Sequence, residues 1–324
     1  MKKILITGAG GFIGSHLAER CVEKGYEVKA FIRYNSKNNW GWLESSAFKN
    51  EIEIYTGDVR DFDSVFDAMQ GCDTIFHLAA LIGIPYSYIS PLAYIRTNVE
   101  GTYNILQAAL KLSMENIITT STSETYGTAQ YVPIDEKHPL VGQSPYSATK
   151  IAADQLAISY YRSFDLPVKL IRPFNTYGPR QSARAVIPTI ISQILSGQTK
   201  IKLGNLTPTR DFTFVKDTAR AFIEIAKVPE LNGEVTNVGT NNEISIGELA
   251  QLICDLMGHD IQIAADAQRV RPENSEVERL LCDNSKVLKY TDWKPQYTFK
   301  TGLQETISWL EKHLSNYKSG IYNI

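Results

Sequence analysis

The sequence predicts an α/β protein in which a Rossmann-type, doubly wound parallel sheet is joined to a smaller α/β C-terminal lobe. Up to residue 172, short apolar runs alternate six times with longer amphipathic stretches. Such alternation is typical of strand–helix–strand units, which build parallel sheets. The first run leads into a glycine-rich turn and a helix, as in dinucleotide-binding folds. After residue 175 the rhythm changes to short strands mixed with helices.

This change of rhythm divides the 324 residues into two parts. We assign residues 1–175 to a dinucleotide-binding domain and residues 176–324 to a substrate-binding lobe. Segments near residues 211–240 are expected to return to the first domain, so the boundary is not sharp. In the second part we expect strands at 200–203, 211–215, 235–238 and 261–263, and helices at 186–196, 217–228, 245–257 and 301–315.

The composition argues against several classes of protein. The formal net charge is −2 and no block of like charge occurs, which argues against a general nucleic-acid binder or a membrane-surface protein. The four cysteines and five histidines are scattered, so we expect buried or incidental thiols and no metal site. The N-terminal segment lacks the apolar stretch of a signal peptide, and no run has the length of a membrane span. We therefore expect a cytoplasmic protein.

A glycine-rich turn follows the first predicted strand, residues 3–7. Three of its four glycines, Gly8, Gly11 and Gly14, are each separated by two residues, and a helix predicted for residues 13–24 begins inside the turn. Glycine permits positive φ and lets a pyrophosphate approach the N–H groups at the helix start. The alternative is a tight turn that binds no ligand. The predicted cofactor contacts in this turn are Gly8, Gly11, Phe12, Ile13 and Gly14.

The second predicted strand, residues 27–32, ends without the acidic residue that usually holds the adenosine ribose of NAD. Arg33 stands there instead, and an arginine can accept the 2′-phosphate of NADP. This favours NADP over NAD as the cofactor. If Arg33 is only a solvated surface residue, the site takes NAD.

The third and fourth predicted strands add further cofactor contacts. After the third strand, Asp58 could accept a hydrogen bond from the adenine amino group, with Val59 beside it. Asp58 could equally cap the helix that follows. The fourth strand, residues 74–80, ends in Ala79 and Ala80, whose small side chains leave room for a cofactor close to the backbone.

Residues 81–91 are predicted to form a loop beyond the fourth strand, and loops in that position often carry ligand contacts. Tyr86 and Ser87 are therefore candidate contacts for a sugar, unless the loop is an ordinary surface loop. A long helix is predicted for residues 92–112. It carries Asn98, which we assign to the cofactor site and expect to brace the neighbouring strand.

A helix predicted to begin at Ser144-Pro145 carries Tyr146 and Lys150, which lie on one face because they are four residues apart. A nearby ammonium and an oxidised nicotinamide both lower the pKa of a tyrosine. Tyr146 could then take a hydroxyl proton while the carbon gives a hydride to the cofactor. Lys150 would also hold the nicotinamide ribose. The alternative is an amphipathic helix with a buried tyrosine and a surface lysine.

Thr122, Ser123 and Glu124 follow the fifth predicted strand, residues 116–120. Removal of a hydride makes a ketone, and a carboxylate such as Glu124 can then take a proton from the neighbouring carbon. The same group, once protonated, can assist the departure of a hydroxyl from the next carbon. Thr122 would hydrogen-bond the ketone oxygen, and Ser123 would orient substrate or water. Alternatively, Glu124 is a structural carboxylate bonded to loop N–H groups.

Two arginines of the second part, Arg210 and Arg271, are candidate contacts for a diphosphate. The guanidinium group forms paired hydrogen bonds with phosphate oxygens, and a sugar nucleotide carries a diphosphate. Each arginine could instead make a surface or interlobe salt bridge.

Together these residues resemble the extended short-chain dehydrogenases that act on sugar nucleotides, and the resemblance covers essentially the whole chain. Thr-Ser-Glu is similar to the motif of GDP-mannose 4,6-dehydratases. The dTDP-glucose 4,6-dehydratases carry Thr-Asp-Glu, so Ser123 departs from their acid. UDP-glucuronate decarboxylases also carry Ser-Thr-Ser-Glu, so this motif does not separate the two reactions. The resemblance rests on Gly8, Gly11, Gly14, Asn98, residues 121–124, Tyr146, Lys150, residues 174–179 and residues 210–212.

Residues 33–42, 80–88 and 204–211 look more specifically like the short dehydratases of bacterial legionaminic-acid pathways. That similarity implies a GDP- or UDP-N-acetylglucosamine 4,6-dehydratase that makes the 4-keto-6-deoxy sugar. Family members pair through their long helices, which implies a homodimer or a homotetramer.

The resemblance also implies roles for individual residues. Tyr146 would be the hydroxyl base and Lys150 its partner. Glu124 would be the base at C5 and the acid at C6. The implied substrate contacts are Thr122, Ser123, Asn175, Arg210 and Arg271.

Three rival functions are compatible with parts of the pattern. A UDP-glucuronate decarboxylase would share the oxidation by Tyr146 but needs a cation for the C6 carboxylate, and residues 84–90 contain neither Arg nor Lys. A nucleotide-sugar 4-epimerase would leave Glu124 idle. A non-catalytic NAD(P) sensor would have no use for a base and a phenol together.

Overall fold

A seven-stranded sheet is the centre of the computed structural model, which describes residues 1–260 and 262–323. All of its strand pairs are parallel, in the order β10-β6-β5-β4-β1-β2-β3. This order confirms the predicted doubly wound α/β fold, with β1 and β4 at the point where the winding reverses. The strands are β1 (Lys3–Thr7), β2 (Glu27–Arg33), β3 (Ile52–Gly57), β4 (Thr74–His77), β5 (Asn116–Thr120), β6 (Val168–Pro173) and β10 (Val235–Val238).

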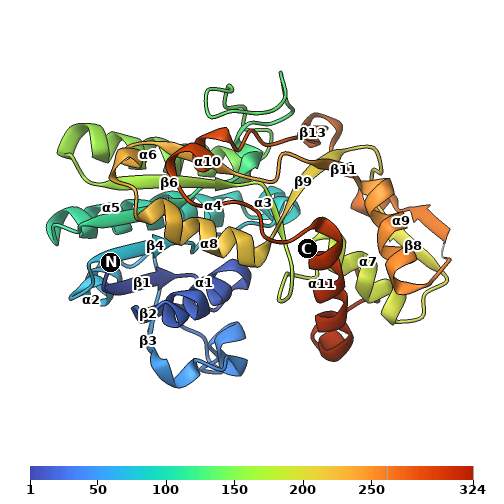
Figure 1. The fold of residues 1–324 in the computed structure, drawn as a ribbon, viewed down its shortest axis with the longest axis horizontal. Coiled ribbons are helices and arrows are strands. Elements are labelled where there is room, and N and C mark those ends of the chain that lie inside the picture. The colour runs from blue at the N-terminus through green and yellow to red at the C-terminus, as the bar shows by residue number, and fades with distance from the viewer. Residues whose placement is uncertain (261, 324) are drawn as a thin grey trace.

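Helices cover both faces of this sheet (Figure 1). They are α1 (Phe12–Glu23), α2 (Phe62–Met69), α5 (Gly101–Lys111), α6 (Pro145–Phe164) and α8 (Val215–Ala226). On one face α1 packs against α8, and on the other α5 packs against α2 and α6. Leu17 and Phe222 belong to the apolar core of the first face, and Ile105 and Ala157 to that of the second. Because both faces are covered, the strands are almost continuously apolar.

A short helix, α3 (Ile84–Ile89), occupies the segment for which the sequence predicts a loop. Pro85 lies in its first turn, where the missing N–H removes no helical hydrogen bond. The Ser87 hydroxyl donates to the Ile84 carbonyl at 2.6 Å. The loop prediction is wrong here because proline and serine are compatible with the start of a helix as well as with a turn.

The long helix predicted for residues 92–112 changes its winding along its length. It consists of α4 (Pro91–Tyr94), the π-helical segment η3 (Ile95–Glu100) and α5. Wider π-helical turns occur frequently next to functional sites. At the start of α5, Gly101 lies against Val59, whose Cγ2 would be 3.0 Å from an added Cβ. The glycine therefore allows this helix to approach the loop after β3.

The C-terminal lobe contains two smaller sheets. In one, β9 (Thr209–Phe214) pairs with β7 (Asn175–Tyr177), β11 (Glu243–Ser245) and β13 (Arg279–Leu280). In the other, β8 (Lys200–Leu203) pairs with β12 (Gln262–Ala265); Ile261, part of the strand predicted for 261–263, lies outside the described residues.

Around these sheets lie α7 (Val186–Leu195), α9 (Ile246–Met257) and α11 (Phe299–His313), gathered on the right in Figure 1. The helices predicted for this part are confirmed with small shifts at their ends. Between them, β10 returns to the large sheet beside β6. No helix among the described residues is long and apolar enough to cross a membrane.

A buried ion pair fastens α6 to the sheet. Arg172 on β6 donates to Asp154 on α6 at 2.7 Å, and the two side chains are only 2% and 3% exposed. Ser121, at the end of β5, donates to the same carboxylate at 2.6 Å and accepts from Arg172 Nε at 3.1 Å. These contacts fix the ends of two strands to the helix that carries Tyr146 and Lys150.

We expect Asp154→Ala to lower the free energy of unfolding by about 3–5 kcal/mol, because it leaves the Arg172 guanidinium buried and unpaired. Urea denaturation followed by circular dichroism measures the loss. Glu23→Ala is the matched control, since it removes a carboxylate from an exposed ion pair with Arg20 and should cost less than about 1 kcal/mol. Equal losses for the two variants would contradict the prediction.

Candidate active site at the carboxyl edge of the sheet

A cavity of about 1000 Å³ runs along the carboxyl edge of the large sheet and into the C-terminal lobe. Its walls come from the segments that follow β1, β4, β5 and β6, together with parts of the C-terminal lobe. Ligands of open α/β sheets bind at this edge. The strand directions therefore bring residues far apart in the sequence to one place.

The glycine turn forms one end of the cavity. Gly8 has φ of 70°, and an added Cβ would lie 2.9 Å from the Ala79 nitrogen. At Gly14 an added Cβ would lie 2.2 Å from the Gly8 oxygen. The turn and the start of α1 can approach each other only with glycine at both positions. Gly11, Phe12 and Ile13 also line the cavity, where the N–H groups at the start of α1 suit an anion.

Arg33, Asp58, Val59, Ala79 and Ala80 line the same end of the cavity. Arg33 is exposed at the end of β2. Asp58 forms an ion pair with Arg60 at 2.5 Å, and this contact holds the pKa of Asp58 below its usual value. The cap of α2 is Asp61, which accepts from the Asp63 nitrogen at 3.1 Å, so the capping alternative for Asp58 is wrong.

The proton-transfer candidates Thr122, Glu124, Tyr146 and Lys150 all line the middle of the cavity. Lys150 donates to the Thr120 carbonyl at 2.5 Å. Glu124 is half-buried, and no group in residues 1–260 or 262–323 hydrogen-bonds to its carboxylate. A structural carboxylate would be expected to accept hydrogen bonds from loop N–H groups. The geometry therefore favours a carboxylate that is available to contact a ligand.

Burial controls the acidity of the two central groups. It raises the pKa of Tyr146, which is only 7% exposed; the Thr122 hydroxyl lowers this pKa, and the Glu124 carboxylate raises it further. Burial lowers the pKa of Lys150, and Asp154 opposes that change. The protein by itself therefore keeps Tyr146 as a neutral phenol. A shift toward the phenolate requires positive charge in addition to that of Lys150, which a ligand in the cavity would supply.

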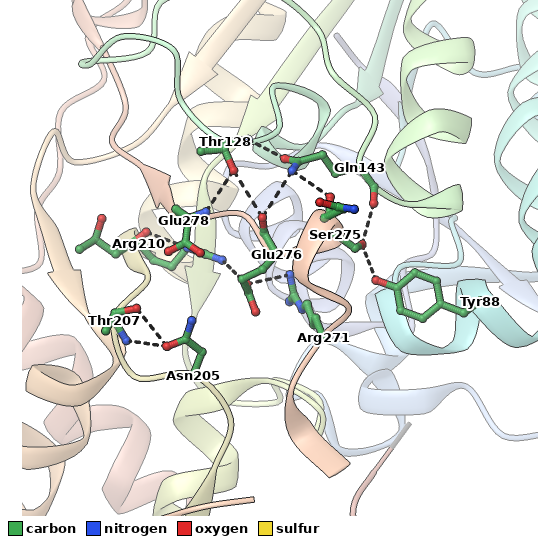
Figure 2. A network of polar contacts seen from close by, with 12 residues as sticks. Tyr88, Thr128, Gln143, Asn205, Thr207, Arg210, Arg271, Ser275, Glu276 and Glu278 are labelled. Carbon is green, nitrogen blue, oxygen red and sulfur yellow. Dashed lines mark hydrogen bonds and ion pairs between the residues drawn. The ribbon is translucent and has the colours of Figure 1, made fainter. Parts of the chain in front are cut away.

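Two arginines converge on one carboxylate where the C-terminal lobe lines the cavity, as Figure 2 shows. Glu276 Oε1 lies 3.5 Å from Arg210 Nη2 and 3.7 Å from Arg271 Nη1. Burial lowers the pKa of Arg210, while the carboxylates of Glu124 and Glu276 raise it. Both predicted arginines thus form ion pairs with the same carboxylate inside the cavity. In that position they could also bind a diphosphate.

The segment 271–278 that carries Glu276 is tied to the dinucleotide-binding domain (Figure 2). The Ser275 hydroxyl lies 2.5 Å from Tyr88 Oη and donates to the Gln143 carbonyl at 2.6 Å. Thr128 Oγ1 donates to the Glu276 carbonyl at 3.4 Å. These bonds hold the arginine–carboxylate cluster at a fixed place beside α3.

Several polar atoms of the cavity wall have no hydrogen-bond partner within the described part of the chain. They include Thr120 Oγ1, Asn175 Oδ1 and Arg271 Nη1, which are buried and make no hydrogen bond there. Buried polar groups normally have partners. Together with the glycine turn and Arg33, they fit a dinucleotide and a second, phosphate-bearing ligand.

Three predicted site residues do not line the cavity. Asn98 is 1% exposed, and its amide bonds the backbone of Leu81 at 2.8 and 2.9 Å. It therefore braces the segment after β4. The Ser87 hydroxyl donates to the Ile84 carbonyl. Ser123, next to Glu124 in the chain, is only 3% exposed. Tyr86 and Asn175, in contrast, do line it.

Other residues line the cavity although we did not predict them as site residues; of these, Asn205 alone falls in the stretch 204–211 that resembles the legionaminic-acid dehydratases. None belongs to a recognisable spacing, and each depends on how the C-terminal lobe folds over the sheet. Only the proximity of Glu276 to Arg271 in the sequence could have drawn attention to that carboxylate. These residues are Arg184, Asn205, Arg269, Glu276, Tyr322 and Asn323.

Similar proteins share both the sequence and the fold. A UDP-N-acetyl-alpha-D-glucosaminuronate decarboxylase of Bacillus cytotoxicus is 34% identical over 322 residues, which cover 96% of this chain and 98% of the relative. The crystal structure of DesIV, a dTDP-glucose 4,6-dehydratase of Streptomyces venezuelae with NAD and TYD bound, has a TM-score of 0.88 at 27% identity and covers 98% of this chain and 99% of that one.

A UDP-N-acetylglucosamine 4-epimerase from Methanobrevibacter ruminantium M1 has a TM-score of 0.87 at 30% identity and covers 96% of this chain and 99% of that one. These three relatives carry out a decarboxylation, a dehydration and an epimerisation by their names, so similarity alone does not select the reaction. The family model described as GDP-mannose 4,6 dehydratase matches residues 5–306. The chain therefore belongs to this family of extended short-chain dehydrogenases, whose members are nucleotide-sugar dehydratases and epimerases.

Proposed function

We propose that the protein is an NAD(P)-dependent 4,6-dehydratase of GDP- or UDP-linked N-acetylglucosamine. Its product would be the 4-keto-6-deoxy sugar, for bacterial surface sugars of the legionaminic-acid type, made in the cytoplasm. The observation that carries this proposal is the Glu124 carboxylate, which lines the cavity beside Tyr146 and Lys150 and accepts no hydrogen bond from the described residues. A carboxylate in that position is suited to proton removal next to a new ketone.

Tyr146 begins the reaction by taking the proton of the C4 hydroxyl. Thr122 hydrogen-bonds the same oxygen, and the Lys150 ammonium favours the phenolate form of Tyr146. A nicotinamide cofactor held by the glycine turn would accept the hydride of C4 and return it to C6. Its positive charge when oxidised offsets the effect of burial on Tyr146.

Glu124 then removes the C5 proton, which the C4 ketone has made acidic, and gives it to the departing C6 hydroxyl. One water leaves, and a double bond remains between C5 and C6. A proton from solvent then enters C5, Tyr146 releases to solvent the proton it took from the C4 hydroxyl, and the hydride removed from C4 ends at C6. The sum is loss of one water with no net redox change. Ser123 cannot replace the acid, because a hydroxyl is far too weak and this one is buried. Glu124 therefore carries both proton transfers at C5 and C6.

Arg184 gives a second candidate function specific support. Its guanidinium lines the cavity, and Nη1 would lie 2.7 Å from a Cβ added at Gly83, just before α3. A cation from the C-terminal lobe therefore lies beside the segment 84–90, which has none of its own. A UDP-glucuronate decarboxylase would use such a cation for the sugar carboxylate. Decarboxylation is thus the second candidate, ahead of 4-epimerisation.

Incubation with GDP-N-acetylglucosamine, UDP-N-acetylglucosamine and UDP-glucuronate separates these functions: product masses distinguish dehydration from decarboxylation, and NMR of the recovered sugar detects a 4-epimer, whose mass is unchanged. We expect loss of one water from an N-acetylglucosamine substrate. If carbon dioxide is released from UDP-glucuronate and no water is lost from the two N-acetylglucosamine substrates, the protein is a decarboxylase and not a dehydratase. If NADP binds while none of the sugar nucleotides is converted, the protein is a sensor instead of an enzyme.

Glu124→Gln should retain substrate binding and lose at least about a hundredfold in the rate of dehydration, because the amide can neither take nor give the proton. Partial reduction of the bound nicotinamide, followed by its absorbance, should persist. Glu115→Gln changes an exposed carboxylate outside the cavity and should keep full activity. Unchanged turnover by Glu124→Gln would refute its role.

We propose NADP as the preferred cofactor, since Arg33 lies at the cavity end of β2 and no acid stands there. Arg33→Ala should weaken NADP binding by about tenfold through loss of a charged hydrogen bond to the 2′-phosphate. NAD binding should stay within about twofold, as measured by titration calorimetry, and Arg20→Ala on the exposed face of α1 should change neither. An equal loss for both cofactors would argue against 2′-phosphate recognition.

A homodimer or homotetramer is part of this proposal. Exposed apolar side chains gather on α3 to α6, and they would be covered if two copies paired through these helices. They are Ile89, Leu92, Ile95, Tyr103 and Phe164.

A further inference from the structure

The cavity continues beyond the two arginines into a region formed by three distant parts of the chain. Gly204 follows β8, and a Cβ added there would lie 2.5 Å from the Arg269 carbonyl. Arg269 is two residues before Arg271 in the same segment. Gly204, Arg269 and Tyr322 all line the cavity. The wall next to the arginine pair is therefore built partly from the last residues of the sequence.

Tyr322 lies over the Arg269 guanidinium, whose Cζ is 5.0 Å from the ring centroid. Arg269 is itself fixed, because its Nε donates to Asp266 Oδ2 at 3.1 Å. Asp266 in turn donates from its backbone to the Leu203 carbonyl at 2.8 Å. The aromatic ring thus rests on a cation that is anchored to the β8–β12 sheet.

The segment 317–323, called the tail below, is fastened along its length. Tyr317 is 8% exposed and donates to the Gln181 carbonyl at 2.7 Å. Ser319 Oγ lies 2.6 Å from Ser196 Oγ, just after α7. The tail is therefore a fixed part of the wall.

Two amides complete the edge of this region with complementary groups. Asn205 Oδ1 accepts from the nitrogen and the hydroxyl of Thr207 at 3.1 and 3.0 Å, so its Nδ2 is the group left to donate. Asn323 Nδ2 donates to the Lys318 carbonyl at 3.1 Å, so its Oδ1 is the group left to accept. Both residues line the cavity. One donor and one acceptor beside an aromatic ring suit the edge and face of a nucleobase.

In a sugar nucleotide the diphosphate lies between the sugar and the nucleoside, and this order indicates which part of the ligand would occupy the region. If the sugar lies at Glu124 and the diphosphate at Arg210 and Arg271, the nucleoside must lie beyond the arginines. We propose that the tail forms a wall of the nucleobase subsite and that Tyr322 packs its ring against the base. This inference rests on the proposed function, because it uses a nucleotide-linked substrate. Bases stack on aromatic rings and on guanidinium planes, and Tyr322 with Arg269 offers both.

Binding of GDP, UDP and inorganic pyrophosphate to the cofactor-loaded protein tests the proposal by titration calorimetry. Tyr322→Ala should weaken GDP and UDP binding by about tenfold or more, which is the range of base–aromatic stacking. Pyrophosphate binding should not change, since its contacts are with the arginines. Tyr322→Phe should bind both nucleotides like the unchanged protein, because the ring is retained.

Tyr290→Ala is the matched control, since that tyrosine also lies against a cation, Lys289 at 5.1 Å, but is on the surface outside the cavity. It should leave all three affinities unchanged. Unchanged GDP and UDP affinity in Tyr322→Ala, or an equal loss for pyrophosphate, would overturn the role of the tail. If the unchanged protein binds neither GDP nor UDP, the proposed function itself fails, which is a different result.

Discussion

The parallel register of the large sheet is the constraint on which the site depends. Thr7 on β1 pairs with His77 on β4, and His77 pairs with Thr119 on β5. Three strands therefore end in one row, so the glycine turn, Ala79 and Ala80, and the Glu124 loop start at the same level. An antiparallel neighbour would have sent one of these loops to the opposite edge. The buried Asp154–Arg172 pair then fixes α6 to this row, which brings Tyr146 to Glu124.

Charge within the cavity makes its chemistry depend on what is bound there. Burial opposes ionisation of both Tyr146 and Lys150, so the empty protein is poorly prepared to remove a proton. Farther along, Glu276 partly neutralises Arg210 and Arg271. A diphosphate would have to share or replace that carboxylate. In the proposed reaction, proton removal would therefore follow occupation of the cavity, and a reactive ketone would not form in the empty protein.

Local patterns predicted the parts of the structure that local physics determines. The strand–glycine–helix sequence specifies the turn after β1, and the four-residue spacing of Tyr146 and Lys150 specifies their common face. Tertiary contacts decided the rest. Asn98 bonds a backbone segment that no spacing in the sequence identifies, α3 forms where turn residues suggested a loop, and Glu276 and Tyr322 reach the cavity only through the folding of the C-terminal lobe. Residue types alone could not place a carboxylate between two arginines or Tyr322 against Arg269.

The central claim is that a carboxylate removes the C5 proton after oxidation at C4, and hydrogen exchange at C5 tests it most directly. The sugar-nucleotide substrate is converted in deuterium oxide, and the product is examined by NMR and mass spectrometry. We expect loss of one water, one solvent deuterium at C5, and transfer of the original C4 hydrogen to C6. A product that retains its C5 hydrogen without exchange, whether an epimer or a decarboxylated sugar, would contradict it.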